Sequence, residues 1–90
     1  MEEDLESFFL NTKPVKMLVS LKYSRTPNYA SAISSKVDAT YSHTVKVLQK
    51  MEKANLVEFE RKGRRKEVFL TEKGDSLADC FKDVLTDLEN

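Results

Sequence analysis

The hydrophobic positions between residues 28 and 54 follow the spacing of two successive α-helices. Apolar side chains at positions 29, 33 and 37 recur once per helical turn, and Asn28 before them is a residue type that caps helix N-termini. Residues 37–39 then form a turn. The pattern therefore predicts one short helix that buries Tyr29, Ile33 and Val37, followed closely by a second helix.

The second helix is predicted from Tyr41 to about Ala54, with Thr40 as its N-cap. Four of its side chains recur at the i, i+3, i+4, i+7 spacing of a single buried face, namely Thr44, Val47, Leu48 and Met51. The remaining positions of this helix are therefore free to face a partner.

Residues 56–71 carry the alternation of a β-hairpin, because apolar residues occupy every second position of two short segments. A turn on Gly63 and Arg64 would place residue 57 opposite residue 70, and residue 59 opposite residue 68, on one face. All four are apolar: Val57, Phe59, Val68 and Leu70. The register is thus consistent with one buried face.

Together these elements predict a mostly α-helical α+β fold in one domain, a winged helix-turn-helix with a two- or three-stranded antiparallel wing. The helix-turn-helix would span residues 28–54 and the wing residues 56–71. Further helices are expected at residues 1–12, at residues 14–23 with Pro14 in the first helical position, and at residues 75–88. A short extended piece within residues 24–27 would supply the third strand.

Residues 28–74 resemble the winged-helix domain of MarR-like and related archaeal transcription regulators. The resemblance rests on Ile33 and Ser34 as an Ile-Ala type pair, on residues 55–57 as a Gly-Leu-Val type exit, and on the Leu-Thr-x-x-Gly return at residues 70–74. Asp38 and Asn55 stand where this pattern commonly has glycine, and both residue types tolerate the left-handed conformation. The resemblance implies binding to double-stranded DNA. The wing pattern and the surface composition favour an archaeal source, cellular or viral.

The exposed side of the second helix mixes cations, hydrogen-bonding groups and one β-branched side chain, as a helix in a DNA major groove does. The candidate DNA-binding residues here are Thr40, Tyr41, Ser42, His43, Val45, Lys46, Gln49 and Lys50. Gln suits adenine, Val suits a thymine methyl group, and the others suit bases or phosphates. The alternative is an ordinary solvated helix face, with His43 a surface residue of the first turn.

The hairpin tip holds five cations in six residues, namely Arg61, Lys62, Arg64, Arg65 and Lys66. Such a tip suits contact with phosphates or insertion of an arginine into a minor groove. A solvated turn is the alternative.

Charge is distributed unevenly although the net charge of the 90 residues is zero. Residues 36–66 hold nine bases and four acids, a net of +5, whereas residues 67–90 hold two bases and seven acids, a net of −5. Residues 1–12 hold four acids and no base. A chain with this distribution is expected to present one basic face to DNA and to turn its acidic ends away.

The terminal helices are expected to form the interface of a two-fold homodimer. The predicted last helix carries an apolar stripe that the first helix of the same or of another chain would cover. The first helix carries apolar residues on one face, and packing of Phe8 and Phe9 within the domain is the alternative to packing on a second subunit. The candidate interface residues are Leu5, Phe8, Phe9, Leu77, Cys80, Phe81, Val84 and Leu88. Cys80 is interpreted as a buried structural thiol, and an intersubunit disulfide or redox switch is the alternative.

Other functional classes find no support in the sequence. No apolar run of 18 residues and no secretory signal is present, so we expect an intracellular, cytoplasmic protein without a membrane partner. One cysteine and one histidine make no metal site, no cofactor is implied, and no catalytic constellation indicates an enzyme.

The predicted function is that of a sequence-specific, double-stranded DNA-binding transcription regulator acting as a homodimer. A winged-helix module that binds protein instead of DNA is the first alternative, favoured by the zero net charge and opposed by the basic tip. A regulator that responds to a small-molecule effector is the second. The operator, the regulated genes and any effector do not follow from the sequence.

Overall fold

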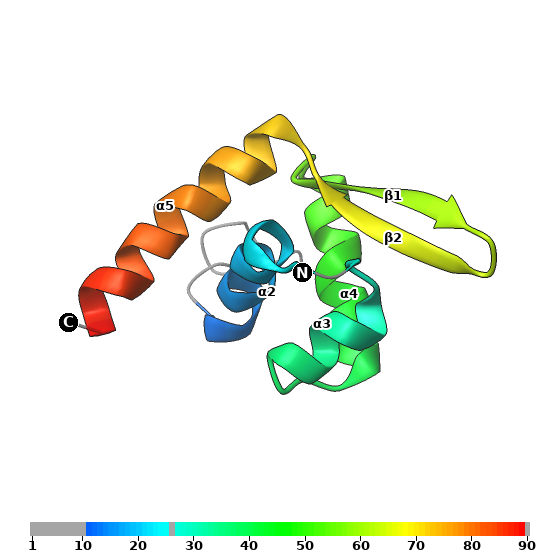
Figure 1. The fold of residues 1–90 in the computed structure, drawn as a ribbon, viewed down its shortest axis with the longest axis horizontal. Helices are drawn as coiled ribbons and strands as arrows, with labels where there is room; N and C mark the ends of the chain where they lie inside the picture. Colours follow the sequence, from blue (N-terminus) through cyan, green and yellow to red (C-terminus); the bar gives the residue numbers. More distant parts are fainter. Residues whose placement is uncertain (1–10, 26, 90) are drawn as a thin grey trace, which may run out of the picture.

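The computed structural model describes residues 11–25 and 27–89. It contains helices α2 (Thr12–Tyr23), α3 (Ala30–Lys36) and α4 (Tyr41–Lys53), strands β1 (Val57–Lys62) and β2 (Arg65–Leu70), and helix α5 (Glu72–Glu89), in that order. The two strands form a hairpin that projects from one side of the molecule, and α5 runs toward the opposite side (Figure 1). The predicted helix at residues 1–12, with Leu5, Phe8 and Phe9, falls almost entirely outside the described residues.

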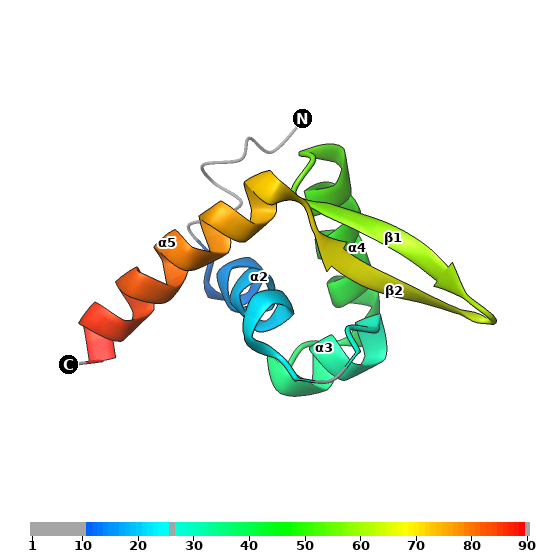
Figure 2. The same cartoon turned by 45° about the horizontal axis from the view of Figure 1, so that its top comes forward.

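Helix α2 lies between α5 and α3 and contacts both (Figure 2). It begins at Thr12, two residues earlier than predicted, so that Pro14 is its third residue and not its first. Proline is tolerated there because the first backbone N–H groups of a helix have no partner within the helix. The inner face of α2 buries Met17, Leu18 and Leu21 in the core.

Helix α3 begins at Ala30 with Tyr29 as its N-cap, one residue later than predicted. Asn28 is not the cap because it bonds to two other elements. Its Nδ2 donates to the carbonyl oxygen of Leu21 at 2.9 Å, and its own carbonyl oxygen accepts from the backbone N–H of Val68 at 2.8 Å. Tyr29 and Val37 are only half-buried, although Val37 packs against the core, so Ile33 is the one residue of the predicted triplet that is fully buried.

The hairpin pairs in the predicted register, with Val57 opposite Leu70 and Phe59 opposite Val68. The sheet has two strands, so the third strand expected within residues 24–27 is not formed by the described residues. The bond from the Val68 N–H to the Asn28 carbonyl links β2 to the residue that follows this segment.

Helix α5 begins at Glu72, three residues before the predicted start, because Thr71 caps it. The backbone N–H of Gly74 donates to Thr71 Oγ1 at 3.0 Å, and Thr71 Oγ1 donates to the carbonyl oxygen of Asn55 at 2.7 Å. Both bonds belong to the Leu-Thr-x-x-Gly return, so this motif joins the end of the wing, the exit of α4 and the start of α5.

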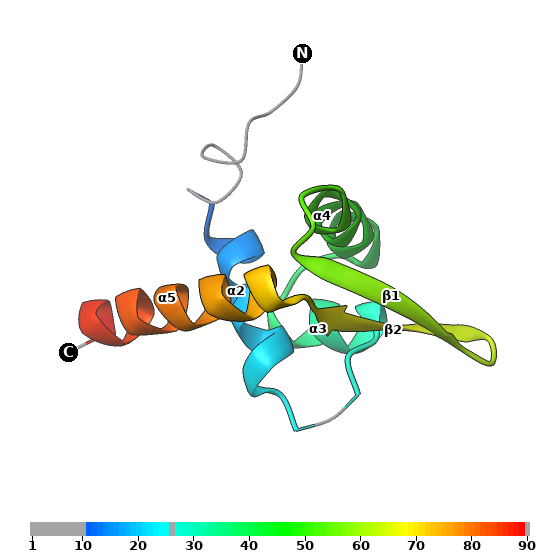
Figure 3. The ribbon, with the colours of Figure 1, turned by 90° about the horizontal axis from the view of Figure 1, so that it is seen from above.

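A single hydrophobic core gathers side chains from every element. Its largest fully buried side chains are those of Met17, Leu18, Ile33, Leu48, Met51, Leu56, Val57, Val68 and Thr44. Seen from above, the hairpin tip extends beyond this core and beyond both α3 and α4 (Figure 3). Across residues 11–25 and 27–89, no helix is long and apolar enough to cross a membrane.

Candidate nucleic-acid interface

Helix α4 starts and packs as its sequence predicts. The hydroxyl of Thr40 accepts from the backbone N–H of His43 at 3.1 Å, which satisfies one of the first N–H groups of the helix. Thr44, Val47, Leu48 and Met51 are the buried residues of α4. The cap fixes the start of the helix and the packed face fixes its rotation. The opposite side of the helix therefore points away from the core.

The turn between α3 and α4 adopts the left-handed conformation at Asp38, whose φ is 55°. Asn55, at the exit of α4, does the same with a φ of 63°, as expected for the two residues that replace glycines. Lys13 of α2 donates to the carbonyl oxygen of Val37 at 3.4 Å and also bonds to that of Asp38. An ammonium group thus binds the exposed carbonyls at the C-terminal end of α3, where the helix dipole favours a cation.

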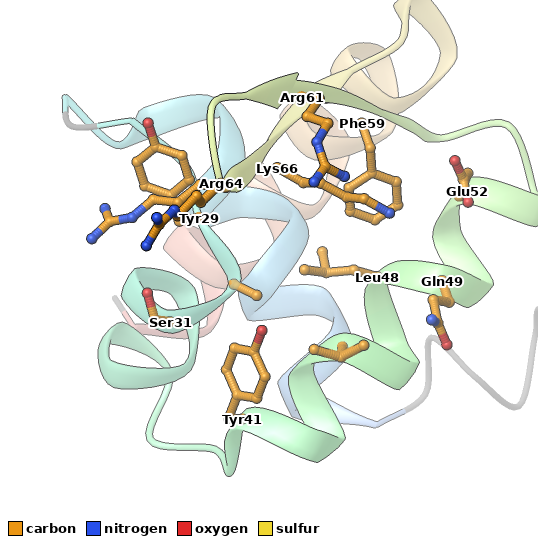
Figure 4. A pocket seen from close by; sticks show the side chains of 13 residues that line it. Tyr29, Ser31, Tyr41, Leu48, Gln49, Glu52, Phe59, Arg61, Arg64 and Lys66 are labelled. Carbon is orange, nitrogen blue, oxygen red and sulfur yellow. The ribbon is translucent and has the colours of Figure 1, made fainter.

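The predicted residues of α4 divide between its two flanks. Tyr41, Val45 and Gln49 line a groove of about 600 Å³ that lies between α3, α4 and the wing (Figure 4). His43, Lys46 and Lys50 line the other flank, in a concavity of about 550 Å³ shared with the start of α2 at residues 11–14. Ser42 and Thr40 line neither cavity and are exposed. The helix is thus accessible along both flanks.

Four wing cations line the same groove as Tyr41 and Gln49, so the structure brings together the two regions that the sequence singled out. These cations are Arg61, Arg64, Arg65 and Lys66. Lys62 lies outside the groove and is paired with Glu60, Nζ to Oε1 at 3.1 Å. This hydrogen bond raises the pKa of the Lys62 ammonium.

Residues of like charge lie directly opposite one another in the wing. Arg61 faces Lys66 and Lys62 faces Arg65, while Glu60 faces Glu67. Cross-strand pairs of like charge destabilise a hairpin. Two consecutive cation pairs are therefore costly for the free protein, and a polyanion bound at the tip would offset that cost.

The groove also contains residues that the sequence analysis did not place there. Tyr29, Ala30 and Ser31 enter it from α3 and its cap, Leu48 and Glu52 from α4, and Phe59 from the wing. The guanidinium of Arg65 lies over the ring of Tyr29, with 4.8 Å from Cζ to the ring centroid. Periodicity assigned Tyr29 to the core, so no sequence signal pointed to this contact. Glu52 could have been found, because it lies one turn beyond Leu48 and on the flank of Gln49.

The apolar stripe of α5 is covered over only half of its length. Leu77 and Phe81 pack against the core, whereas the side chains of Val84 and Leu88 are 51% and 78% exposed. Cys80 is also exposed, so its interpretation as a buried thiol is wrong for the single chain. The reason is helical geometry: α5 follows the core only over its first turns, and Cys80 lies beside the covered face and not on it.

A cluster of three or more metal-ligating side chains does not occur among the described residues. The polar side chains that line the groove and the concavity beside it are mostly cations, amides and hydroxyls, together with the imidazole of His43 and one carboxylate, that of Glu52. Cations, amides and hydroxyls are groups that bind anionic and hydrogen-bonding surfaces.

Comparison with known proteins identifies the fold and the family of this chain. Residues 13–82 match the model of the family described as the DUF6293 C-terminal winged helix domain. A protein of Archaeoglobus fulgidus is 30% identical over 93 residues, which cover 100% of this chain and 98% of that one. The crystal structure of AF1382 from the same organism superposes with a TM-score of 0.80 at 32% identity, covering 87% of this chain and 89% of that chain.

The fold is shared with regulators of lower identity. MepR, a transcription regulator of the Staphylococcus aureus multidrug efflux pump MepA, superposes with a TM-score of 0.79 at 22% identity, and this chain spans 64% of its length. The structure of the S. aureus MepR-DNA complex covers 96% of this chain and 73% of its own, at 21% identity and a TM-score of 0.75. The winged helix-turn-helix predicted from the sequence, with its resemblance to MarR-like regulators, is thereby confirmed as the fold. The chain belongs to the DUF6293 C-terminal winged helix domain family.

Proposed function

We propose that this protein is a double-stranded DNA-binding transcription regulator that places α4 in the major groove and the wing against the adjacent backbone or minor groove. The observation that carries the proposal is the groove that Tyr41, Val45 and Gln49 of α4 line together with four cations of the wing. Base-reading and phosphate-binding groups thus lie on two walls of one surface, as a single duplex requires.

The dimensions of α4 suit this role. Its 13 residues make a rod about 20 Å long, and the major groove admits one α-helix across its width. Ser42 and Gln49 are exposed and offer hydrogen bonds to base edges. Lys46 and Lys50, on the other flank, are placed to reach phosphates of the second strand.

The charge distribution favours the same orientation. The segment from residue 36 to residue 66, which holds α4 and the wing, has nine bases and four acids, whereas residues 67–90 have two bases and seven acids. Helix α5 points away from the wing (Figure 1). A polyanion would therefore attract the wing side and repel the α5 side. The fold shared with MepR, whose complex with DNA is known, supports the assignment, and a DNA-binding regulator would act in the cytoplasm.

The protein acts as a homodimer in this proposal. Val84 and Leu88 expose apolar surface on the part of α5 that extends from the core, and a second copy would cover it. The predicted contribution of Leu5, Phe8 and Phe9 remains part of the proposal. Two recognition helices would then enter successive major grooves about 34 Å apart on a pseudo-palindromic site.

Substitution of Gln49 tests base reading against backbone contact. Gln49→Ala is expected to change the preferred DNA sequence. The loss of binding free energy, about 1–3 kcal/mol, should be confined to sites that carry the base contacted by Gln49. Arg64→Ala is expected to weaken binding to every duplex and to reduce the slope of log K against log salt by about one.

Lys82→Ala is the matched control for Arg64→Ala, because it removes one cation from α5, away from the groove. Titrations of a specific and an unrelated duplex at four salt concentrations supply the measurement. An equal loss on both duplexes after Gln49→Ala would contradict base reading by this side chain.

A further inference from the structure

Arg65 differs from the other wing cations because its guanidinium contacts an aromatic ring, that of Tyr29. The distance of 4.8 Å from the guanidinium carbon to the ring centroid lies within the range of a cation–π interaction. Arg65 is the first residue of β2, and Tyr29 is the N-cap of α3. The contact therefore joins the tip of the wing to the helix-turn-helix, 36 residues earlier in the sequence.

Two hydrogen bonds continue this connection toward the core. The N–H of Val68, three residues after Arg65, donates to the carbonyl oxygen of Asn28, and the amide of Asn28 donates to the carbonyl oxygen of Leu21 on α2. The backbone carbonyl of Tyr29 accepts from the N–H of Ile33, within α3. Residues 28 and 29 thus attach β2 to both α2 and α3.

The wing needs such an attachment because it is a ribbon of only two strands. An isolated two-stranded hairpin is marginally stable in water. Val57 and Val68 hold the base of this hairpin in the core, whereas the facing cations at its tip repel one another. Lys62 is paired with Glu60, and Arg65 is placed on the ring of Tyr29. Among the described residues, Arg61, Arg64 and Lys66 form no ion pair.

We infer that the wing cations have two different tasks: Arg65 and Tyr29 are positioning residues that fix the angle of the wing, and Arg61, Arg64 and Lys66 contact the DNA backbone. Arg65 remains on the Tyr29 ring in the complex. The part of this inference that concerns contact with DNA rests on the proposed function. The contact of Arg65 with Tyr29, which we call the anchor, is a property of the free protein.

Salt dependence distinguishes an anchor from a phosphate ligand. Arg65→Ala is expected to weaken binding about two- to five-fold at every salt concentration, the equivalent of one exposed cation–π contact, and to leave the salt slope unchanged. Arg64→Ala is expected to reduce the slope by about one. A reduction of the slope by about one in Arg65→Ala would overturn the inference, because it would show that Arg65 neutralises a phosphate.

Two substitutions of Tyr29 form a matched pair of variants that differ in whether the aromatic ring is kept. Tyr29→Phe keeps the aromatic face and is expected to bind DNA as the wild type does, whereas Tyr29→Leu is expected to show the same two- to five-fold loss with an unchanged slope. A structural requirement for the Tyr29 hydroxyl would instead affect Tyr29→Phe. Equal affinity of Tyr29→Leu and wild type would overturn the inference.

Measurements on the free protein keep this test independent of the proposed function. In an NMR spectrum the side-chain protons of Arg65 are expected to be shifted by the Tyr29 ring current, and the shift should vanish in Tyr29→Leu and persist in Tyr29→Phe. Amide exchange at Val68 should accelerate equally in Tyr29→Leu, in Arg65→Ala and in the double variant. An unshifted Arg65 in the wild type would overturn the anchor. A wild type with the shift but without affinity for any duplex would overturn the proposed function and leave the anchor standing.

Discussion

Gly74 lies directly against the backbone of Leu56, at the junction of the wing and α5. A Cβ atom added at Gly74 would lie 1.9 Å from the carbonyl oxygen of Leu56 and 3.2 Å from Cδ2 of Leu70. The same carbonyl oxygen accepts from the N–H of Thr71 at 3.0 Å, so it cannot move without breaking the start of α5. The glycine of the Leu-Thr-x-x-Gly return is therefore required by close packing and not by an unusual φ.

We expect Gly74→Ala to lower the free energy of unfolding by about 3 kcal/mol, because the backbone must shift to admit the methyl group. Gly63→Ala is the matched control. Gly63 has a φ of +61° with no atom within 4 Å of an added Cβ, so its replacement should cost only about 1 kcal/mol of conformational strain. Urea unfolding of both variants measures the difference, and an equal cost would contradict the packing explanation.

Single residues also show where the sequence was informative and where it was not. Thr40 caps α4, and Asp38 and Asn55 adopt the left-handed conformation, as the sequence predicts, because a cap or a left-handed position depends on local chemistry. Asn28 was misassigned as a cap because its actual partners, Leu21 and Val68, lie 7 and 40 residues away in the sequence. Contacts of that kind depend on the tertiary arrangement.

At the scale of elements, the end of α2 is bound to the first half of α5 by a polar cluster. Lys22 Nζ lies 3.0 Å from Asp75 Oδ2 and 2.6 Å from Asp79 Oδ2, and the hydroxyl of Tyr23 donates to Asp79 Oδ1 at 2.5 Å. Hydrogen bonds from Lys22 and then Tyr23 lower the pKa of Asp79 below its ordinary value of 3.8. Hydrogen bonds to Asp79 and Asp75 raise the pKa of Lys22. The cluster fixes the direction in which α5 leaves the core.

The lowered pKa of Asp79 predicts how this cluster responds to acid. A group whose pKa is lower in the folded state stabilises the fold above its unfolded pKa and loses that contribution as the pH falls through the folded value. Asp79→Asn should therefore be less stable than the wild type at pH 7, and the difference should shrink as the pH falls below about 4.

Thermal unfolding between pH 2.5 and pH 7 measures this prediction. Asp87→Asn, an exposed change on the same helix, is the control and should follow the wild type throughout. A constant difference between Asp79→Asn and the wild type across this range would contradict the role given to the carboxylate.

Helix and strand patterns predicted the elements better than their ends. The inner face of α4 and the hairpin register followed from periods of 3.6 and 2, since both faces are buried against the same core. The starts of α2 and α5 were placed too late, because Pro14 and Gly74 suggested boundaries but lie inside the first turns. The groove was predicted only as two separate basic regions. Of its aromatic residues, Tyr29 and Phe59 are ones that periodicity assigned to the core, whereas Tyr41 is a predicted DNA-binding residue.

At the scale of the whole molecule, the basic wing and the exposed end of α5 lie on opposite sides (Figure 1). A homodimer formed through α5 would leave both wings and both α4 helices accessible. The apolar surface of Val84 and Leu88 would then be buried, and Cys80, exposed on the same helix, would lie near the interface.

We expect the wild type to sediment at twice the mass of the chain at micromolar concentration, and the double variant Val84→Asp/Leu88→Asp to sediment as a monomer with an unchanged helix content. Thr86→Asp introduces one negative charge on α5, at a position between Val84 and Leu88 in the sequence, and should remain dimeric. A monomeric wild type, or a dimer that survives the double variant, would contradict the proposed interface.

The most direct test of the central claim is selection of bound duplexes from a random pool by the wild-type protein at two salt concentrations. The account predicts an enriched inverted repeat whose half-sites lie about ten base pairs apart, with binding that weakens as salt rises. Salt-sensitive binding without any enriched sequence would contradict base reading by α4. Absence of binding to any duplex at low salt would contradict the DNA-binding function itself.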